Sequence, residues 1–414
     1  MQKFTRQEKI KILFSFPVIV AALGYFVDIY DLLLFGIVRV PSLNDLHLNP
    51  DVAGTIIINY QMVGLLLGGI LWGMLGDKKG RLSVLFGSIL VYSLANIACG
   101  FLPQINFGDK VMVYAILRFI AGFGLAGELG VGITLVSESL PKELRALGTS
   151  MVAGFGILGA VVVELTVELA GSWTTAYFIG GFLGLTLLFL RVSVSESLIF
   201  NVVKANSDVK RGNFVSFFTN KDRFFRYIKC ISIGLPIWFC IGILIFMANQ
   251  FAPEMGIKSI NPGKAILWTY LFAAAGDFSS GFIAQKLKSR KKTMTYFLIF
   301  TIIGVVLLLF SGTNSENKYY FFCAWIGLGT GFWALFITLA AEQFGTNLRS
   351  TATTTIPNIV RGMVPIMLFA FDFFKQNTSV INAAALVAVI VFGIALYSVL
   401  TIEETHHKDL DFLD

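Results

Sequence analysis

Charged residues are scarce in this chain of 414 residues: Asp, Glu, Lys and Arg make up 14% of it, whereas 56% of the residues are hydrophobic. An ordinary water-soluble domain contains about 25% charged residues. The composition, with a mean hydropathy of +0.77, therefore excludes a single soluble core covered by a polar surface. Most of the surface is expected to face lipid.

Histidine and cysteine are also rare. The three histidines are His47, His406 and His407, and the apolar segments supply no combination of nucleophile, base and oxyanion-binding group. The four cysteines lie in apolar runs without metal-ligand spacing. A nucleotide-binding loop of the GxxxxGK[ST] kind is absent. We therefore expect no enzyme, no metal and no cofactor, and an ion gradient rather than ATP as the energy source.

Long hydrophobic runs, by contrast, are abundant. A helix needs about 20 mostly apolar residues to cross the hydrocarbon core of a bilayer. Such runs are predicted at residues 14–40, 52–75, 82–102, 111–137, 146–170, 173–192, 228–250, 264–286, 292–311, 319–341, 350–374 and 380–401. The sequence thus predicts an all-α integral membrane protein with twelve transmembrane helices.

The net charge of +7 is distributed unevenly among the connections between these runs. The N-terminal tail and every second connection are rich in Lys and Arg. The intervening connections contain only Lys110, Lys258, Lys264, Lys318 and Lys375. Basic residues accumulate on the cytoplasmic side of membrane proteins. The charge therefore predicts that both termini are cytoplasmic, and it does not indicate a nucleic-acid partner.

An internal repeat divides the chain into two halves. Residues 193–227 form the longest polar and basic connection, between a bundle at 1–192 and a bundle with its tail at 228–414. Glu138-x6-Arg145 after the fourth run recurs as Glu342-x6-Arg349 after the tenth. We therefore expect two pseudo-symmetric six-helix bundles, as in transporters built from repeats.

The turn between the second and third runs carries a family signature. It reads Gly73-Met-Leu-Gly76-Asp77-Lys-Lys-Gly80-Arg81, in which the glycines permit close helix approach and a tight turn. This turn resembles the signature loop of the major facilitator superfamily. The resemblance implies that Asp77 bridges to the other half and to Arg145 when the carrier faces outward. It also implies a gating role for the residues of the turn and of the repeat: Gly73, Gly76, Asp77, Gly80, Arg81, Glu138, Arg145, Glu342 and Arg349.

The resemblance extends over nearly the whole chain. The segment from Arg118 to Glu128 is similar to the fourth helix of metabolite:proton symporters and, less closely, of sugar porters. Segments 195–197 and 403–405 resemble motifs after the sixth and twelfth helices of the same branch. In the second-half copy of the signature, Gly281 and Arg290 remain but no Asp corresponds to Asp77.

Ionisable residues within the runs are the candidates for ion coupling, because such side chains are costly in a membrane. Asp28 and Asp31 are three residues apart and share one helix face. Two carboxylates this close repel each other when both are ionised, so one of them can load and release a proton. Arg118 is the expected counter-ion. The resemblance to sugar porters implies proton coupling by such a pair, and a fixed ion pair without titration is the alternative.

Arg361, near the centre of the eleventh run, is the candidate for binding an anion, because a guanidinium can hold a carboxylate with two hydrogen bonds. The alternative is a salt bridge to Glu164 or Asp28. Further candidates for substrate contacts are polar or aromatic residues within the runs: Trp333, Asn358, Glu128 and Tyr60.

The sequence-based hypothesis is a monomeric secondary transporter in the cytoplasmic membrane of a bacterium. It would take up a small carboxylate-bearing metabolite, either an organic acid or an amino acid, together with protons by alternating access. A proton-driven exporter of drugs, metabolites or siderophores is the runner-up, because residues do not reveal the direction of flux. A transporter-like sensor is a third hypothesis.

Overall fold

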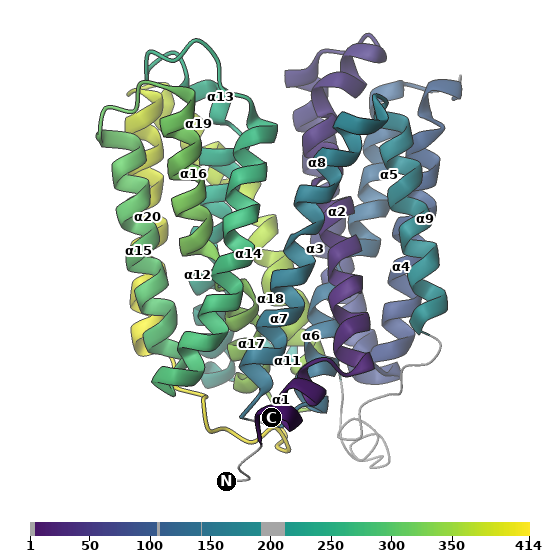
Figure 1. Ribbon diagram of the computed structural model, residues 1–414, viewed down its shortest axis with the longest axis vertical. Helices are drawn as coiled ribbons and strands as arrows, with labels where there is room; N and C mark the ends of the chain where they lie inside the picture. Colours follow the sequence, from purple (N-terminus) through teal and green to yellow (C-terminus); the bar gives the residue numbers. More distant parts are fainter. Residues whose placement is uncertain (1–4, 106–107, 142, 192–211) are drawn as a thin grey trace.

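The computed structural model describes residues 5–105, 108–141, 143–191 and 212–414. Within these residues, twelve helical segments are long and apolar enough to cross a membrane, which confirms the predicted fold class. Figure 1 shows them as two bundles side by side, with both termini at one end of the molecule. We call this end the basal end.

The first bundle contains the helices α1 (Arg6–Leu13), α2 (Phe16–Asp45), α3 (Pro50–Lys79), α4 (Arg81–Gly100), α5 (Lys110–Leu125), α6 (Glu128–Ser139), α7 (Arg145–Ile157), α8 (Gly159–Ala170) and α9 (Trp173–Arg191), with a short 3₁₀ turn, η1 (Leu102–Gln104). The second contains α11 (Ser216–Thr219), α12 (Lys221–Phe239), η2 (Cys240–Ile245), α13 (Ala248–Phe251), α14 (Pro262–Leu287), α15 (Arg290–Phe310), α16 (Glu316–Thr330), α17 (Trp333–Gln343), α18 (Arg349–Gly362), α19 (Val364–Lys375) and α20 (Val380–Thr401).

Among the described spans, four are interrupted part-way along their length, and a fifth changes from α-helix to π-helix. The fourth span breaks between α5 and α6, and the tenth breaks at the corresponding place between α16 and α17. The fifth and eleventh spans break between α7 and α8 and between α18 and α19, and the seventh continues from α12 into the π-helical turn η2. Broken helices expose backbone groups at the depth where transporters bind solutes.

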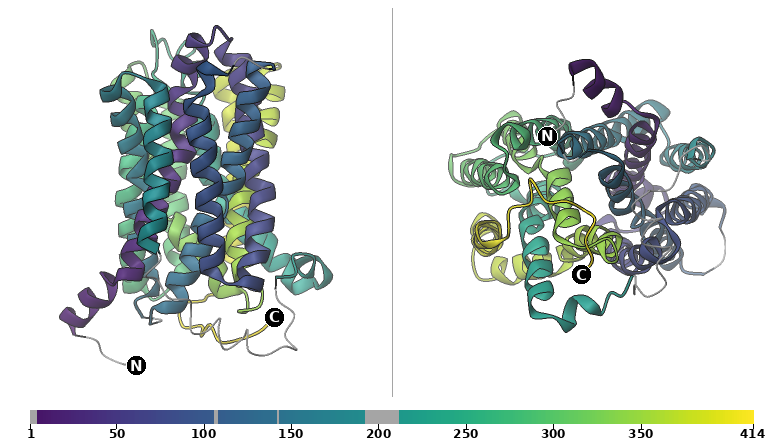
Figure 2. Two further views of the ribbon diagram at one scale, coloured as in Figure 1. Left: turned by 90° about the vertical axis from the view of Figure 1, so that its right-hand side faces the viewer. Right: turned by 90° about the horizontal axis from the view of Figure 1, so that it is seen from below.

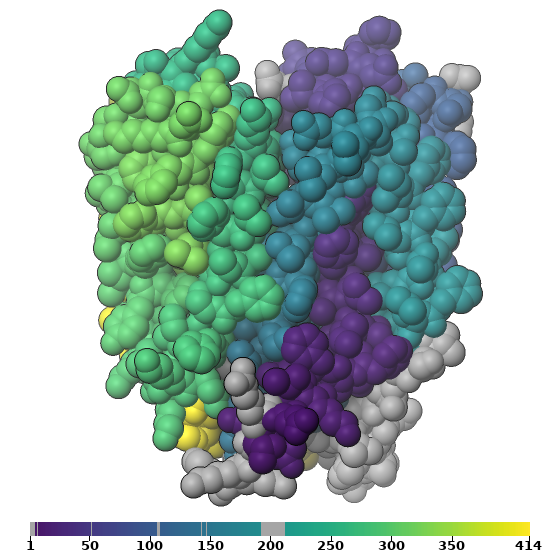
Figure 3. Space-filling model, in the orientation of Figure 1, coloured from purple at the N-terminus to yellow at the C-terminus, as the bar shows by residue number. Residues whose placement is uncertain are grey.

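The outer surface of the bundles is apolar. Large hydrophobic side chains such as Phe189, Phe369 and Val389 are 73 to 80% exposed on different spans. In water such a surface would favour aggregation, whereas in a bilayer it contacts the lipid chains. Figure 3 shows the two halves meeting along a seam, with a notch between them at the end opposite the termini.

Glycines on α3 let it pack closely against α18 of the other bundle. A Cβ atom on Gly73 would lie 3.0 Å from Cα of Thr351, and one on Gly76 would lie 2.2 Å from Oγ of Ser350. Gly80 has a φ of 110° at the turn before α4, a conformation that favours glycine. The glycines of the signature turn therefore serve helix contact (Gly73 and Gly76) and the turn itself (Gly80).

The boundaries of the two domains stay a prediction. Residues 192–211, which include the resemblance at 195–197 and most of the predicted linker at 193–227, lie outside the described residues. Within the linker's remainder, α11 is a separate short helix and α12 begins at Lys221 rather than at residue 228. The first turn of α12 carries Lys221, Asp222 and Arg223, and these charges hid the helix start from a search for apolar runs.

The Gly73 contact predicts a conformational effect. Gly73→Val should push α3 and α18 apart, because the nearest atoms belong to backbone, and overpacking of this kind costs about 1–3 kcal/mol. The spin-label distance between Lys79→Cys and Lys286→Cys, both exposed at the basal end, should lengthen in a pulsed electron paramagnetic resonance experiment. The four native cysteines are buried and should remain unlabelled.

Gly132→Val is the matched control, because a Cβ atom there meets nothing within 4 Å. An unchanged distance distribution in Gly73→Val, or an equal change in both variants, would contradict the role of this contact.

Candidate functional site

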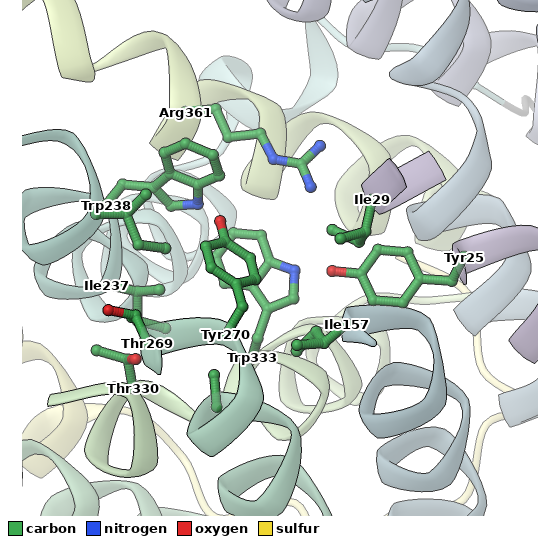
Figure 4. A pocket seen from close by; sticks show the side chains of 12 residues that line it. Tyr25, Ile29, Ile157, Ile237, Trp238, Thr269, Tyr270, Thr330, Trp333 and Arg361 are labelled. Atoms are coloured by element: carbon green, nitrogen blue, oxygen red, sulfur yellow. The ribbon is translucent and has the colours of Figure 1, made fainter. Parts of the chain in front are cut away.

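A small cavity lies between the two bundles near the helix breaks (Figure 4). It is lined by Tyr25 of α2, Trp238 of α12, Tyr270 of α14, Trp333 of α17 and Arg361 of α18, together with smaller residues. Its volume of about 30 Å³ is enough for one or two water molecules. The aromatic side chains must therefore move apart when a larger solute binds.

The guanidinium of Arg361 points into this cavity. Its carbon lies 5.5 Å from the ring centroid of Trp238 and 5.6 Å from that of Trp333, at cation–π distance from both rings. Its Nη1 donates to Oδ1 of Asn358 at 3.2 Å, and its buried Nε has no hydrogen-bond partner within the described ranges. Arg361 is thus a buried cation with spare donors.

The expected alternative, a salt bridge from Arg361 to Glu164 or Asp28, is wrong. Among the described residues, no carboxylate lies within ion-pair distance of Arg361. Glu164 projects instead from α8 toward the start of α14, where its carboxylate oxygens would be 3.2 and 3.3 Å from a Cβ atom on Gly263. The positive charge of Arg361 therefore remains available to an anion.

Three predicted substrate contacts lie elsewhere. Asn358 does not line the cavity. Its amide donates to the carbonyl of Ala126 at 3.0 Å and so connects α18 to the first bundle. Glu128 forms a buried salt bridge with Arg191, the last residue of α9. Tyr60 is partly buried and does not line the cavity. Their polarity was visible in the sequence, but the contacts that occupy Asn358 and Glu128 were not.

Asp28 and Asp31 are both completely buried on α2. The carboxylate oxygens of both residues have no hydrogen-bond partner among the described residues. An isolated charge in such surroundings is very costly, and a bound proton removes that cost. The two carboxyl groups are therefore suited to hold protons.

The expected pairing of Asp31 with Arg118 is only half right. Nη2 of Arg118 donates to the backbone carbonyl of Asp31 at 3.0 Å and not to its carboxylate. Nη1 donates to Asn96 at 2.9 Å and Nε to Gln61 at 3.3 Å. Arg118 thus joins α2, α3 and α4 through neutral acceptors and leaves the carboxylate of Asp31 without a direct ion pair.

The expected bridge from Asp77 to Arg145 is also wrong. The carboxylate of Asp77 accepts from the backbone N–H groups of Ser350 (3.0 Å) and Thr351 (2.8 Å) and from Oγ1 of Thr351 (2.7 Å) at the first turn of α18. A carboxylate at a helix N-terminus satisfies free donors and complements the helix dipole. Asp77 therefore bridges the halves as expected, through a helix end rather than an arginine.

Six charged residues form the basal cluster: Arg81, Glu138, Arg145, Arg290, Glu342 and Arg349. Glu138 accepts from Arg81 of its own bundle and from Arg349 of the other, both at 3.0 Å. Glu342 accepts from Arg290 of its own bundle and from Arg145 of the other, both at 3.2 Å. The repeat thus forms a symmetric closure of the basal end.

Arg290 was missed as a member of the basal cluster. It stands at the first position of α15, as Arg81 stands at the first position of α4, and each donates to the glutamate of its own bundle. The signal was present in the sequence, since Arg290 is the retained arginine of the degenerate second signature.

The C-terminal segment reaches the same cluster, across the basal end of the second bundle (Figure 2). Oγ1 of Thr405 donates to Oε2 of Glu342 at 2.7 Å, and Glu404 caps the start of α15 by accepting from N of Arg290 at 2.9 Å. Nη1 of Arg290 lies 2.9 Å from Nδ1 of His406. Because arginine only donates, this contact requires an unprotonated Nδ1.

Comparison with known proteins agrees with this architecture. The sequence profile described as Major Facilitator Superfamily matches residues 21–368. A putative metabolite transport protein of Haemophilus influenzae is 28% identical, over 94% of this chain and 96% of its own. The niacin transporter NiaP of Acinetobacter baylyi is 25% identical, over 95% and 94%. The solved structure of the proton:xylose symporter XylE superposes with a TM-score of 0.76 at 15% identity, covering 97% of this chain and 98% of that one.

His406 predicts a pH dependence of the C-terminal segment. Burial and the neighbouring charge of Arg290 lower the pKa of His406 to about 4, below its ordinary value of about 6.5. The stabilisation that needs a neutral ring is complete above pH 6.5 and is lost as the pH falls toward 4. A spin label at Asp411→Cys, an exposed position, should become more mobile over this interval.

His406→Asn is the control, because its amide oxygen can accept from Arg290 but does not titrate. If the mobility of the label changes equally with pH in this variant, protonation of carboxylates and not of His406 releases the segment.

Proposed function

This chain belongs to the major facilitator superfamily, and we propose that it imports a small aromatic carboxylate together with protons. The fold makes it a multi-pass membrane transporter. In this proposal the basal end faces the cytoplasm of a bacterium, in line with the concentration of Lys and Arg there. Solute is exchanged between the two sides by alternating opening of the seam.

The observation that carries the substrate class is the guanidinium of Arg361 beside the rings of Trp238 and Trp333. A carboxylate can accept two parallel hydrogen bonds from the guanidinium. The ring of an aromatic acid can then stack on Trp238 or Trp333, which flank the same group at 5.5 and 5.6 Å. Niacin, named as the substrate of the Acinetobacter relative, combines a carboxylate with an aromatic ring. An amino acid would add an ammonium group, for which the cavity lining offers no carboxylate.

The closed basal cluster supports entry of the solute from the opposite end. Two salt bridges, Arg145–Glu342 and Arg349–Glu138, cross the seam at the basal end, whereas the notch in Figure 3 lies at the other end. Proton coupling in this proposal uses Asp28 and Asp31, whose carboxylate oxygens have no hydrogen-bond partner among the described residues. A proton taken up from outside neutralises a buried carboxylate, and release to the cytoplasm follows when the seam opens there.

Substitution of Arg361 tests the substrate class. Arg361→Ala should weaken nicotinate binding about 10- to 100-fold, the loss expected for charge-assisted hydrogen bonds, and Arg361→Lys should retain part of the affinity because it keeps the charge without the fork. Binding would be measured by isothermal titration calorimetry on the purified protein.

Nicotinamide, which has the same ring but no charge, is the ligand control and should bind weakly to all three proteins. Equal binding of nicotinate by the parent protein and Arg361→Ala would overturn the anion site. Binding of a non-aromatic acid as tight as that of nicotinate would overturn only the aromatic specificity.

Substitution of the two aspartates tests the coupling. In proteoliposomes with an imposed pH gradient, Asp28→Asn and Asp31→Asn should each reduce accumulation of the acid at least about tenfold, while exchange of labelled for unlabelled acid without a gradient continues. The reason is that an amide cannot carry the proton. An unchanged dependence on the gradient in both variants would remove the coupling role.

A further inference from the structure

The repeat that carries the basal cluster is longer than its charges. Thr134 precedes Glu138 by four residues and Thr149 follows Arg145 by four, giving the pattern T-x3-E-x6-R-x3-T. The second bundle repeats it with Thr338, Glu342, Arg349 and Thr353. Residues four apart on a helix lie one turn apart on the same face, so each threonine accompanies a cluster residue one turn deeper in the membrane.

The four threonines meet in pairs across the seam. Oγ1 of Thr134 on α6 lies 2.7 Å from Oγ1 of Thr353 on α18, and Oγ1 of Thr149 on α7 lies 2.7 Å from Oγ1 of Thr338 on α17. All four side chains are completely buried. The pairing is symmetric. In each pair, a threonine that precedes the glutamate of one bundle contacts the threonine that follows the arginine of the other.

Each of these hydroxyls also lies within hydrogen-bond distance of the carbonyl one turn earlier in its own helix, at 2.8 to 2.9 Å. A hydroxyl has one proton and can accept as well. In each pair, one threonine therefore donates across the seam while the other donates to its own helix. When the seam opens, both protons can return to the helix carbonyls, so no donor is stranded.

Two other buried hydroxyls of α18 lack this choice between two hydrogen-bond acceptors. Oγ of Ser350 and Oγ1 of Thr354 on α18 are buried without a hydrogen-bond partner among the described residues. Both side chains face the glycines of α3 across the seam. Closing the seam therefore costs the hydration of these groups, and this cost opposes the salt bridges of the basal cluster.

We propose that Thr134, Thr149, Thr338 and Thr353 form a second layer of the basal gate, between the charged cluster and the central cavity. Their two cross-seam hydrogen bonds favour the closed basal end. The threonines are neutral, and when the seam opens their hydroxyls can bond to water or to the helix carbonyls instead. The two bonds therefore stabilise the closed basal end without preventing it from opening.

The test is a double-mutant cycle read as a conformational equilibrium. The population with a long distance between spin labels at Lys79→Cys and Lys286→Cys reports opening of the basal end, whatever solute the protein carries. Thr149→Val and Thr338→Val should each raise the ratio of open to closed protein about fivefold, as expected for one neutral hydrogen bond. The double variant should raise it by about the same factor, because both substitutions remove one shared bond.

Two comparisons separate the bond from a packing effect. Thr149→Ser keeps the hydroxyl and should restore the closed population. Thr301→Val is the control within one bundle, since Thr301 is buried and, among the described residues, its hydroxyl bonds to the carbonyl of Phe297 in its own helix. The unbonded combination Thr134→Val with Thr338→Val should show independent, multiplying effects.

Multiplying effects within the pair Thr149 and Thr338, or an equal shift in Thr301→Val, would overturn the second gate layer. If a single Val variant fails to fold, as judged by its thermal unfolding, the Ser and Val variants of the pair Thr134 and Thr353 provide the same cycle. None of these outcomes depends on proton coupling or on the substrate class.

Discussion

The cost of burying a charge away from water dominates this structure. An unpaired ion in a medium of low dielectric constant is unstable by several kcal/mol, so the guanidinium and carboxylate groups at the basal end have to meet. Glu138 and Glu342 are each shared by an arginine of their own bundle and an arginine of the other. Because each glutamate serves arginines of both bundles, the same ion pairs that stabilise the buried charges also join the bundles.

Glycine and helix ends complete this closure. Gly73 and Gly76 bring α3 to the backbone of α18, and at that distance the carboxylate of Asp77 reaches the free N–H groups of the helix end. The opposite end of the seam has no comparable charge network among the described residues. An unequal distribution of cross-seam bonds of this kind is what lets two rigid bundles rock around a central site.

The interior of the transporter, away from the basal end, contains exceptions to charge pairing. Arg361 has aromatic faces and an amide for neighbours, and the carboxylate oxygens of Asp28 and Asp31 have no hydrogen-bond partner in the part of the chain that the structure describes. Such groups cost stability in the empty protein. In the proposed cycle a substrate anion binds the guanidinium and a proton binds a carboxylate. Binding of the transported species therefore removes the cost of these unpaired charges.

The membrane fold was predictable because its determinants are local. Length, hydropathy and the positions of Lys and Arg can be read directly from the sequence. Each predicted run overlaps an observed span, and the largest differences are at span ends, such as the charged first turn of α12 and the C-terminal extension of α2 to Asp45. The repeat of Glu138 and Arg145 in Glu342 and Arg349 likewise identified four of the six members of the basal cluster before their contacts were known, whereas Arg290 was missed.

The partners of the buried charged side chains were not predictable in the same way. The sequence by itself determined twelve spans, two related halves and a short list of buried ionisable residues. Only the tertiary structure decided that Asp77 caps α18 rather than binding Arg145, that Glu128 pairs with Arg191, and that Arg361 contacts an amide and, among the described residues, no carboxylate. The physical reason is range: hydropathy acts between a residue and its solvent, whereas a salt bridge or a helix cap needs two groups from distant parts of the chain at about 3 Å.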